Sequence, residues 1–256
     1  MRRVLKWAAL LVVVVVVVLV AVVVAAFSGL APIADWQRLD GVEVVKDGLV
    51  ACYLVDLRPG EVALVDACND ASGKAVIAAL TKRGLRPDAV KAVFLTHGDK
   101  DHISGVLAFP GVQVLALATD VALAEGRETR FLKGLISPKD TGVRVTRSLG
   151  DGEVVELPGA AFQAYAVPGH TRGSAAFLAR GVLFMGDSAE VTTEGTLAPA
   201  KRLTSDDPAQ NRASLARLAR RLEPAASDVR AIAPAHSGLL VRGLSPLTDF
   251  ARAARE

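Results

Sequence analysis

The chain has few cysteines and little net charge. Two cysteines in 256 residues are too few for a small disulfide-framed protein or a zinc module built on thiolates. The formal net charge is +3, and Arg2, Arg3 and Lys6 account for the whole surplus. The part that follows is electrically neutral, so it lacks the basic excess typical of nucleic-acid binding, and we expect no nucleic-acid partner. Hydrophobic residues make up 51% of the chain, which excludes a disordered protein.

A long apolar run opens the chain and extends from Trp7 to Phe27 without a charged residue. At about 1.5 Å per residue, a helix of this length spans the roughly 30 Å hydrocarbon core of a bilayer. Residues 7–27 are therefore predicted to be a transmembrane anchor in the lipid bilayer. Because basic residues mark the cytoplasmic side, residues 1–6 are predicted to be cytoplasmic. The prediction is a single-pass protein of the cell membrane whose domain lies on the outer side, periplasmic or extracellular.

A second interpretation of the same segment stays open. A cleaved signal peptide also begins with basic residues and an apolar run, although that run is usually about 7–15 residues long. Ala25, Ala26, Ser28 and Gly29 supply the small side chains of a cleavage site. Under either interpretation the remainder of the chain is delivered outside the cytoplasm.

The rest of the chain reads as a linker, residues 28–40, followed by one domain, residues 41–256. Short apolar strands alternate with helices in two successive halves, which indicates two sheets with helices packed outside them. Gly142–Ser148, Glu153–Leu157 and Ala160–Val167 are expected to be antiparallel strands. Pro208–Leu222 is expected to be the longest helix of the domain, with leucines on its apolar face. Glu190–Asp207 is expected to be an irregular loop at the mouth of the site.

All four histidines of the chain lie just after predicted strands, and carboxylates occupy the same kind of position. In layered α/β proteins ligands collect at strand ends, where loops bring side chains together over a rigid base. A lone histidine is more often a structural residue, but that does not explain four of four at strand ends. Imidazole and carboxylate groups without thiolate suit zinc, iron or manganese. The residues in these positions are Asp66, His97, Asp99, Asp101, His102, His170, Asp187 and His236.

These motifs resemble those of the metallo-β-lactamase superfamily. The main signature of that family, Thr-His-x-His-x-Asp-His, is matched by residues 96–102 except at its second histidine. Its later motifs are matched by Pro-Gly-His-Thr at 168–171, by Gly-Asp at 186–187 and by Pro-Ala-His-Ser at 234–237. The resemblance runs from Gly41 to the C-terminus. It implies an α+β fold: a four-layer αβ/βα sandwich of two mixed β-sheets with helices on the outer faces.

The resemblance also implies a site for two divalent metal ions, with zinc as the expected metal. One ion would be held by His97, Asp99 and His170, and the other by Asp101, His102 and His236, while Asp187 would bridge them. Asp99 stands where the family has histidine. A carboxylate there adds negative charge and hardness, which makes iron or manganese an alternative. Because its side chain is shorter than that of histidine, a weak or vacant first site is the other outcome.

Several further residues are expected to support the site. Asp66 either accepts a hydrogen bond from a ligand or a loop amide, or is only a turn residue at a strand end. Thr171 is expected to steady the loop that carries His170. Cys52 and Cys68 lie nearly opposite each other across a predicted hairpin turn, so an exported domain would allow a disulfide between them. The alternative is two small buried residues.

The predicted function is that of a membrane-anchored metallohydrolase acting on a small molecule. Metal-bound hydroxide would attack an ester, thioester, lactone or amide, and Asp101 would be the catalytic residue that orients it and relays its proton. Two alternatives stay open. One is a metal-poor, non-catalytic binding module on the same fold, with Asp99 marking the loss of chemistry, and the other is a mononuclear iron redox enzyme.

Overall fold

Two mixed β-sheets pack face to face in the computed structural model, which describes residues 6–7, 10–18, 21, 28–130 and 137–253. The first sheet has seven strands in chain order, antiparallel from β1 to β4 and parallel from β4 to β7. Its strands are β1 (Arg38–Leu39), β2 (Val42–Asp47), β3 (Val50–Asp56), β4 (Val62–Val65), β5 (Val90–Leu95), β6 (Gln113–Leu117) and β7 (Arg147–Leu149).

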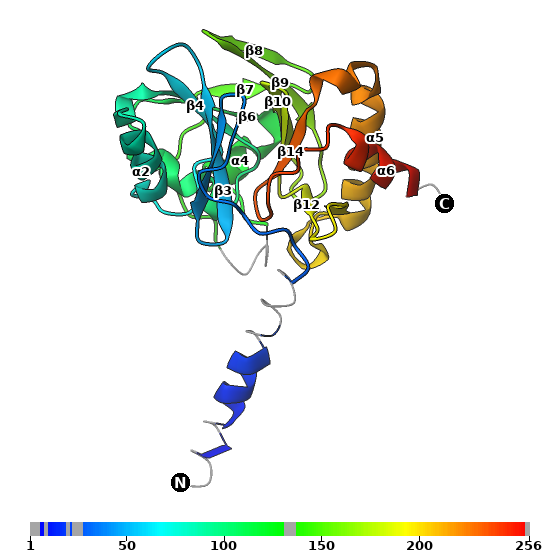
Figure 1. Ribbon diagram of the computed structural model, residues 1–256. Coiled ribbons are helices and arrows are strands. Elements are labelled where there is room, and N and C mark those ends of the chain that lie inside the picture. Colours follow the sequence, from blue (N-terminus) through cyan, green and yellow to red (C-terminus); the bar gives the residue numbers. More distant parts are fainter. Residues whose placement is uncertain (1–5, 8–9, 19–20, 22–27, 131–136, 254–256) are drawn as a thin grey trace.

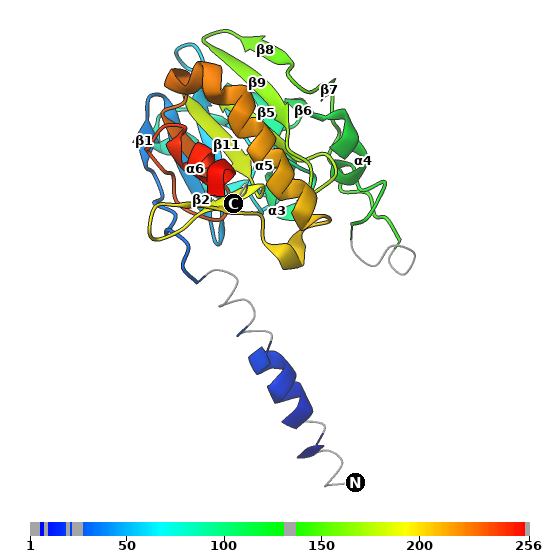
Figure 2. The ribbon, with the colours of Figure 1, turned by 90° about the vertical axis from the view of Figure 1, so that its right-hand side faces the viewer.

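The second sheet has five strands in the order β14-β11-β10-β9-β8, and only the pair β11 and β14 is parallel. Helix α2 (Lys74–Lys82) covers the outer face of the first sheet, and α5 (Pro208–Leu222) and α6 (Ser245–Ala253) cover that of the second (Figures 1 and 2). The predicted sandwich of two mixed sheets between helices is confirmed. The strands are β8 (Val154–Leu157), β9 (Ala160–Ala166), β10 (Ala175–Ala179), β11 (Val182–Gly186) and β14 (Ala231–Pro234).

Strand β5 is almost wholly apolar because it lies between two cores. Ala92 and Phe94 point into the core between the sheets, while Val93 and Leu95 point into the core under α2. Because successive side chains alternate between faces and both faces are buried, neither side of the strand tolerates a polar pattern. Phe94 stacks on Phe162 of β9 with ring centroids 4.0 Å apart, which joins the two sheets directly.

Two parts of the predicted secondary structure are wrong. The expected antiparallel strand at 142–148 is the short strand β7, which pairs in parallel with β6 in the first sheet. Thr146 N donates to Val114 O at 2.9 Å and directs the chain there. The segment expected to be an irregular loop, Glu190–Asp207, is irregular only in part, because it contains most of a small two-stranded sheet formed by β12 (Ala189–Val191) and β13 (Leu197–Pro199). Apolar alternation predicts a strand but does not say which neighbour it pairs with.

The segment predicted to be a linker lies along the domain. Ala31 N donates to Val191 O at 2.8 Å, and Gly238 N donates to Ala31 O at 2.9 Å, so the chain is held between two parts of the second half.

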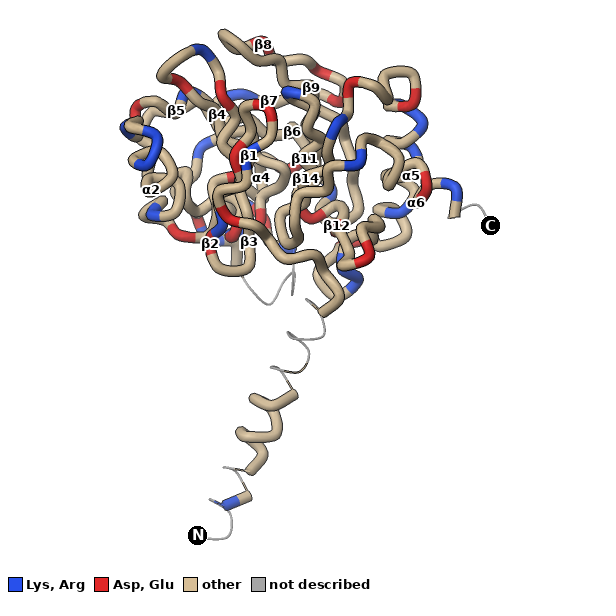
Figure 3. Tube along the Cα trace, in the orientation of Figure 1, with Lys and Arg blue, Asp and Glu red and all other residues tan. Residues whose placement is uncertain are grey.

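Acidic and basic residues are interspersed over the domain (Figure 3).

The predicted anchor, residues 7–27, lies partly outside the described residues, as does most of the basic segment before it. Its described part from 10 to 18 is helical, and those side chains are 47–65% exposed. Among the residues that the structure describes, no helix has both the length and the apolar character needed to cross a membrane.

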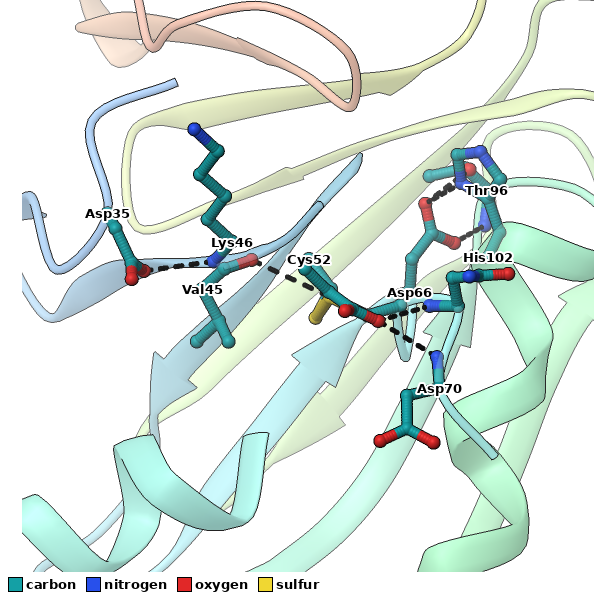
Figure 4. The surroundings of a disulfide bond; sticks show 11 residues. Asp35, Val45, Lys46, Cys52, Asp66, Asp70, Thr96 and His102 are labelled. Atoms are coloured by element: carbon teal, nitrogen blue, oxygen red, sulfur yellow. Dashed lines mark hydrogen bonds and ion pairs between the residues drawn. A yellow bond between two sulfur atoms is a disulfide. The ribbon is translucent and has the colours of Figure 1, made fainter. Parts of the chain in front are cut away.

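Cys52 and Cys68 form a disulfide with Cα atoms 5.4 Å apart (Figure 4). The register pairs Tyr53 with Val65, so Cys68 lies beyond the end of β4. Left-handed backbone at Asp66 (φ 56°) and at Cys68 (φ 63°) turns the chain so that the second sulfur returns to the strand. Both cysteines are buried in the core under α2.

Removal of this disulfide should lower the free energy of unfolding by about 3 kcal/mol, because the cross-link closes a loop of 16 residues in the unfolded chain. The double variant Cys52→Ala, Cys68→Ala tests this by urea titration of the metal-free protein. Reductant should shift the wild-type transition and leave that of the variant in place. An unchanged wild-type transition in reductant would contradict the prediction.

Candidate metal centre

The histidines and carboxylates singled out by the sequence meet at one edge of the sandwich. His97, Asp99, Asp101 and His102 follow β5, and the remaining ligands follow β9, β11 and β14. Strands β4 and β5 are parallel in one sheet, and β11 and β14 are parallel in the other. Because parallel strands end at the same edge of a sheet, the loops that leave them converge.

Two groups of ligand atoms are formed there. His97, His170 and Asp187 make the first group, and Asp101, His102 and His236 make the second. In each group the ligand atoms lie within 4.8 Å of one another. This division matches the two sites that the resemblance implies, apart from the place of Asp99.

Asp187 faces both groups. Its Oδ1 lies 3.2 Å from His102 Nε2 and 3.2 Å from His236 Nε2. Its Oδ2 lies 3.5 Å from His170 Nε2. One carboxylate thus places an oxygen toward each group, which is the geometry expected of a bridging ligand.

Three buried polar atoms at the centre have no hydrogen-bond partner within the described part of the chain: His97 Nε2, His102 Nε2 and Asp187 Oδ1. Buried polar groups in native proteins nearly always have a hydrogen-bond partner, so three ligand atoms without one in the same place indicate an ion. The donor set contains imidazole nitrogens and carboxylate oxygens and suits zinc, iron or manganese. The residues therefore fit two divalent metal ions.

The electrostatics of the centre also favour cations. Burial raises the pKa of Asp101, but the hydrogen bond from His236 and the charge of His102 outweigh burial and lower it to about 2. Burial lowers the pKa of His236, but the charge of Asp187 and the hydrogen bonds to Asp101 and Asp187 raise it to about 10. Without metal, the positive charge of protonated histidine balances the negative charge of the carboxylates. Since a ligating imidazole is neutral, metal binding releases protons.

Asp66 supports His102. Its Oδ2 accepts a hydrogen bond from His102 Nδ1 at 2.8 Å, and its two oxygens accept from Thr96 N and Thr96 Oγ1, both at 2.7 Å (Figure 4). A proton on Nδ1 leaves Nε2 as the free ligand atom and fixes the ring. Of the two interpretations of Asp66, the geometry favours the partner of a ligand.

The loop that carries His170 is held by side chains of its own. Thr171 is fully buried, and its Oγ1 lies 2.9 Å from Ser174 Oγ. Thr171 N also donates to the Ser174 hydroxyl at 2.9 Å. Thr171 is thus placed to steady the loop, in the position that the sequence suggests.

Asp120 is a supporting residue that the sequence reasoning missed. Its buried carboxylate accepts from Gly98 N at 2.6 Å and from Gly173 N at 3.2 Å, so it ties together the two loops that carry ligands. Glycine is required at both positions because neighbouring backbone atoms come too close for a side chain. A Cβ on Gly98 would lie 2.5 Å from Ala124 N, and one on Gly173 would lie 2.5 Å from Asp120 N.

Asp99 lies at the edge of the first group, in contact with Arg130. Its Oδ2 is 3.5 Å from His97 Nε2 and 3.3 Å from His170 Nε2, and it accepts a hydrogen bond from Arg130 Nη1. The Arg130 side chain is only 4% exposed. Sequence reasoning missed this arginine because it belongs to none of the motifs or periodic segments.

A family model described as "Metallo-beta-lactamase superfamily" matches residues 45–236. The chain therefore belongs to the metallo-beta-lactamase superfamily, and the family expected from the motifs is confirmed.

The relatives found agree with this assignment. The chain is 32% identical to a hydroxyacylglutathione hydrolase of Serratia proteamaculans over 53% of this chain and 45% of the relative. It is 36% identical to a hydroxyacylglutathione hydrolase of Stenotrophomonas maltophilia over 46% of this chain and 39% of the relative. It thus spans less than half the length of these relatives. A solved B3 metallo-beta-lactamase with an active-site glutamic acid has the same fold, with a TM-score of 0.64 at 21% identity, covering 91% of each chain.

Asp66→Asn should weaken zinc binding by about 10- to 100-fold, because the His102 ring loses its charged partner while the left-handed backbone still suits asparagine. Competition with a chromophoric chelator measures the affinity. The matched control is Asp88→Asn, whose side chain is 80% exposed. Equal zinc affinities of the Asp66→Asn variant and the wild type would assign Asp66 to the turn alone.

Proposed function

We propose that the protein is a metal-dependent hydrolase that cleaves an activated carbonyl bond, foremost a thioester, in a small molecule. The observation that carries the proposal is the pair of ligand groups that share Asp187, each with buried ligand atoms that lack a hydrogen-bond partner. These two groups would hold two divalent ions, of which zinc is the first candidate, and the ions would supply Lewis-acid chemistry, polarising a carbonyl and lowering the pKa of water.

Asp101 is the proposed catalytic residue. Its side chain is 39% exposed, in contrast to the buried histidines beside it, so a water and a substrate can reach it. Its Oδ2 lies 3.3 Å from His236 Nε2, and the Nδ1 of that histidine lies 2.7 Å from Leu49 O. The carboxylate is thus held in place while it accepts a proton from the attacking water and passes it to the leaving group.

The thioester is the preferred substrate class because the relatives are hydroxyacylglutathione hydrolases. Esters, lactones and amides present the same electrophilic carbon and belong in the same screen. Fold alone does not select among them, so the β-lactam of the family name has no priority.

Asp101→Asn should lower kcat for a thioester by about 10²- to 10⁴-fold, because asparagine cannot accept the proton. The measurement is thiol release followed with a thiol-reactive dye, together with elemental analysis of the same samples. Elemental analysis separates loss of the proton acceptor from loss of an ion.

Asp249→Asn is the matched control for this variant, since its side chain is 58% exposed and pairs with Arg252. Removal of metal by a chelator should abolish turnover, and zinc should restore it. Wild-type protein loaded with zinc that hydrolyses none of the four bond classes would refute the proposed activity.

We further propose that residues 7–27 hold the domain on the outer side of a cell membrane. Two observations support this: the run is apolar and uncharged, and the disulfide suits an oxidising compartment. The full chain should then stay with the membrane fraction after alkaline carbonate extraction, whereas a chain starting at Ser28 should not. A full chain released by carbonate, or a mature protein that begins near residue 29, would contradict the anchor.

A further inference from the structure

Arg130 is buried among three loops of the metal centre. Its Nη1 donates to Asp99 Oδ2, and its Nε lies 3.2 Å from Asp206 Oδ1. Its Nη2 donates to the main-chain oxygens of His170 and Thr204. A guanidinium keeps its charge at all physiological pH values, so this position holds a permanent cation.

The same guanidinium stands among atoms that the first ion would use. Arg130 Nη1 lies 3.3 Å from His170 Nε2, which in turn lies 3.3 Å from Asp99 Oδ2. Arg130 thus pairs with Asp99, the carboxylate that replaces the second histidine of the family signature. A divalent ion entering the first group would meet both a cation and a carboxylate that is already paired.

The carboxylates of the second group have partners of another kind. Asp101 and Asp187 form ion pairs with the imidazoles of that group, His102 and His236. Imidazole nitrogens are themselves metal ligands, so the partners of these carboxylates can bind the ion. The guanidinium of Arg130 cannot do so.

We propose that Arg130 neutralises Asp99 and makes the first metal site weaker than the second, so that the two ions bind in order. The second group, completed by Asp187, fills first. Asp99 acts as the partner of Arg130 rather than as a strong ligand. The inference rests on the proposed metal-dependent function and concerns the affinity of each site.

Titration of the metal-free full chain with zinc tests the order of binding. The wild type should take up one ion tightly and a second with at least 10-fold weaker affinity, measured by calorimetry and by elemental analysis after dialysis. Arg130→Gln should strengthen the weaker step by about 10-fold or more, because the fixed charge is gone. Arg130→Lys, which keeps the charge, should resemble the wild type.

Arg127→Gln is the control, since that side chain is 60% exposed and pairs with Glu125. The inference would be overturned if the wild type bound two ions with equal affinity. It would also be overturned if Arg130→Gln left the affinity of the weaker step unchanged or lowered it. Either result would leave the proposed function intact. A wild type that binds no zinc would overturn both. The wild-type titration shows whether the two affinities differ even if the Arg130→Gln variant does not fold.

Discussion

The alignment of parallel strand ends along one shared edge of two packed sheets is the constraint on which the rest of the structure depends. Strands β4 and β5 end beside each other in one sheet, and β11 and β14 do so in the other. The stacked rings of Phe94 and Phe162 join the sheets. Since these strands are buried on both faces, the loops that leave them start from rigid positions. Ligands more than 130 residues apart in the chain, His97 and His236, can therefore share one centre.

A shell of hydrogen-bonded carboxylates then orients the ligands. Asp66 fixes the ring of His102, and Asp120 ties together the loop that contains Gly98 and the loop that contains Gly173. Each carboxylate accepts hydrogen bonds from several donors, which offsets part of the free-energy cost of burying it. The buried atoms at the centre that lack a hydrogen-bond partner all belong to the two groups of ligands. Among the described residues, three of the six buried side-chain atoms without a hydrogen-bond partner are thus atoms that a divalent cation can satisfy.

The replacement of histidine by Asp99 changes the balance of charge at this centre. An added carboxylate without compensation would increase the repulsion from Asp187 and the other acids nearby. Arg130 lies against Asp99 with 4% of its side chain exposed, so the compensation is built into the loops and is not left to solvent. Position 99 and position 130 therefore have to be understood together, although nothing in the sequence connects them.

The sequence by itself determined the family, the alternating strands and helices, and the ligand types, because hydrophobic periodicity and motif spacing are local properties of the chain. Helix α5 occupies Pro208–Leu222 as predicted, since its leucines recur at the helical period and a proline opens its first turn. Tertiary structure decided the rest. Strand β7 joins the first sheet, the segment 28–40 lies along the domain, and Asp120 and Arg130 reach the metal centre. Such pairings depend on which distant surfaces meet, and charge neutralisation inside a protein depends on distance in space rather than on separation along the chain.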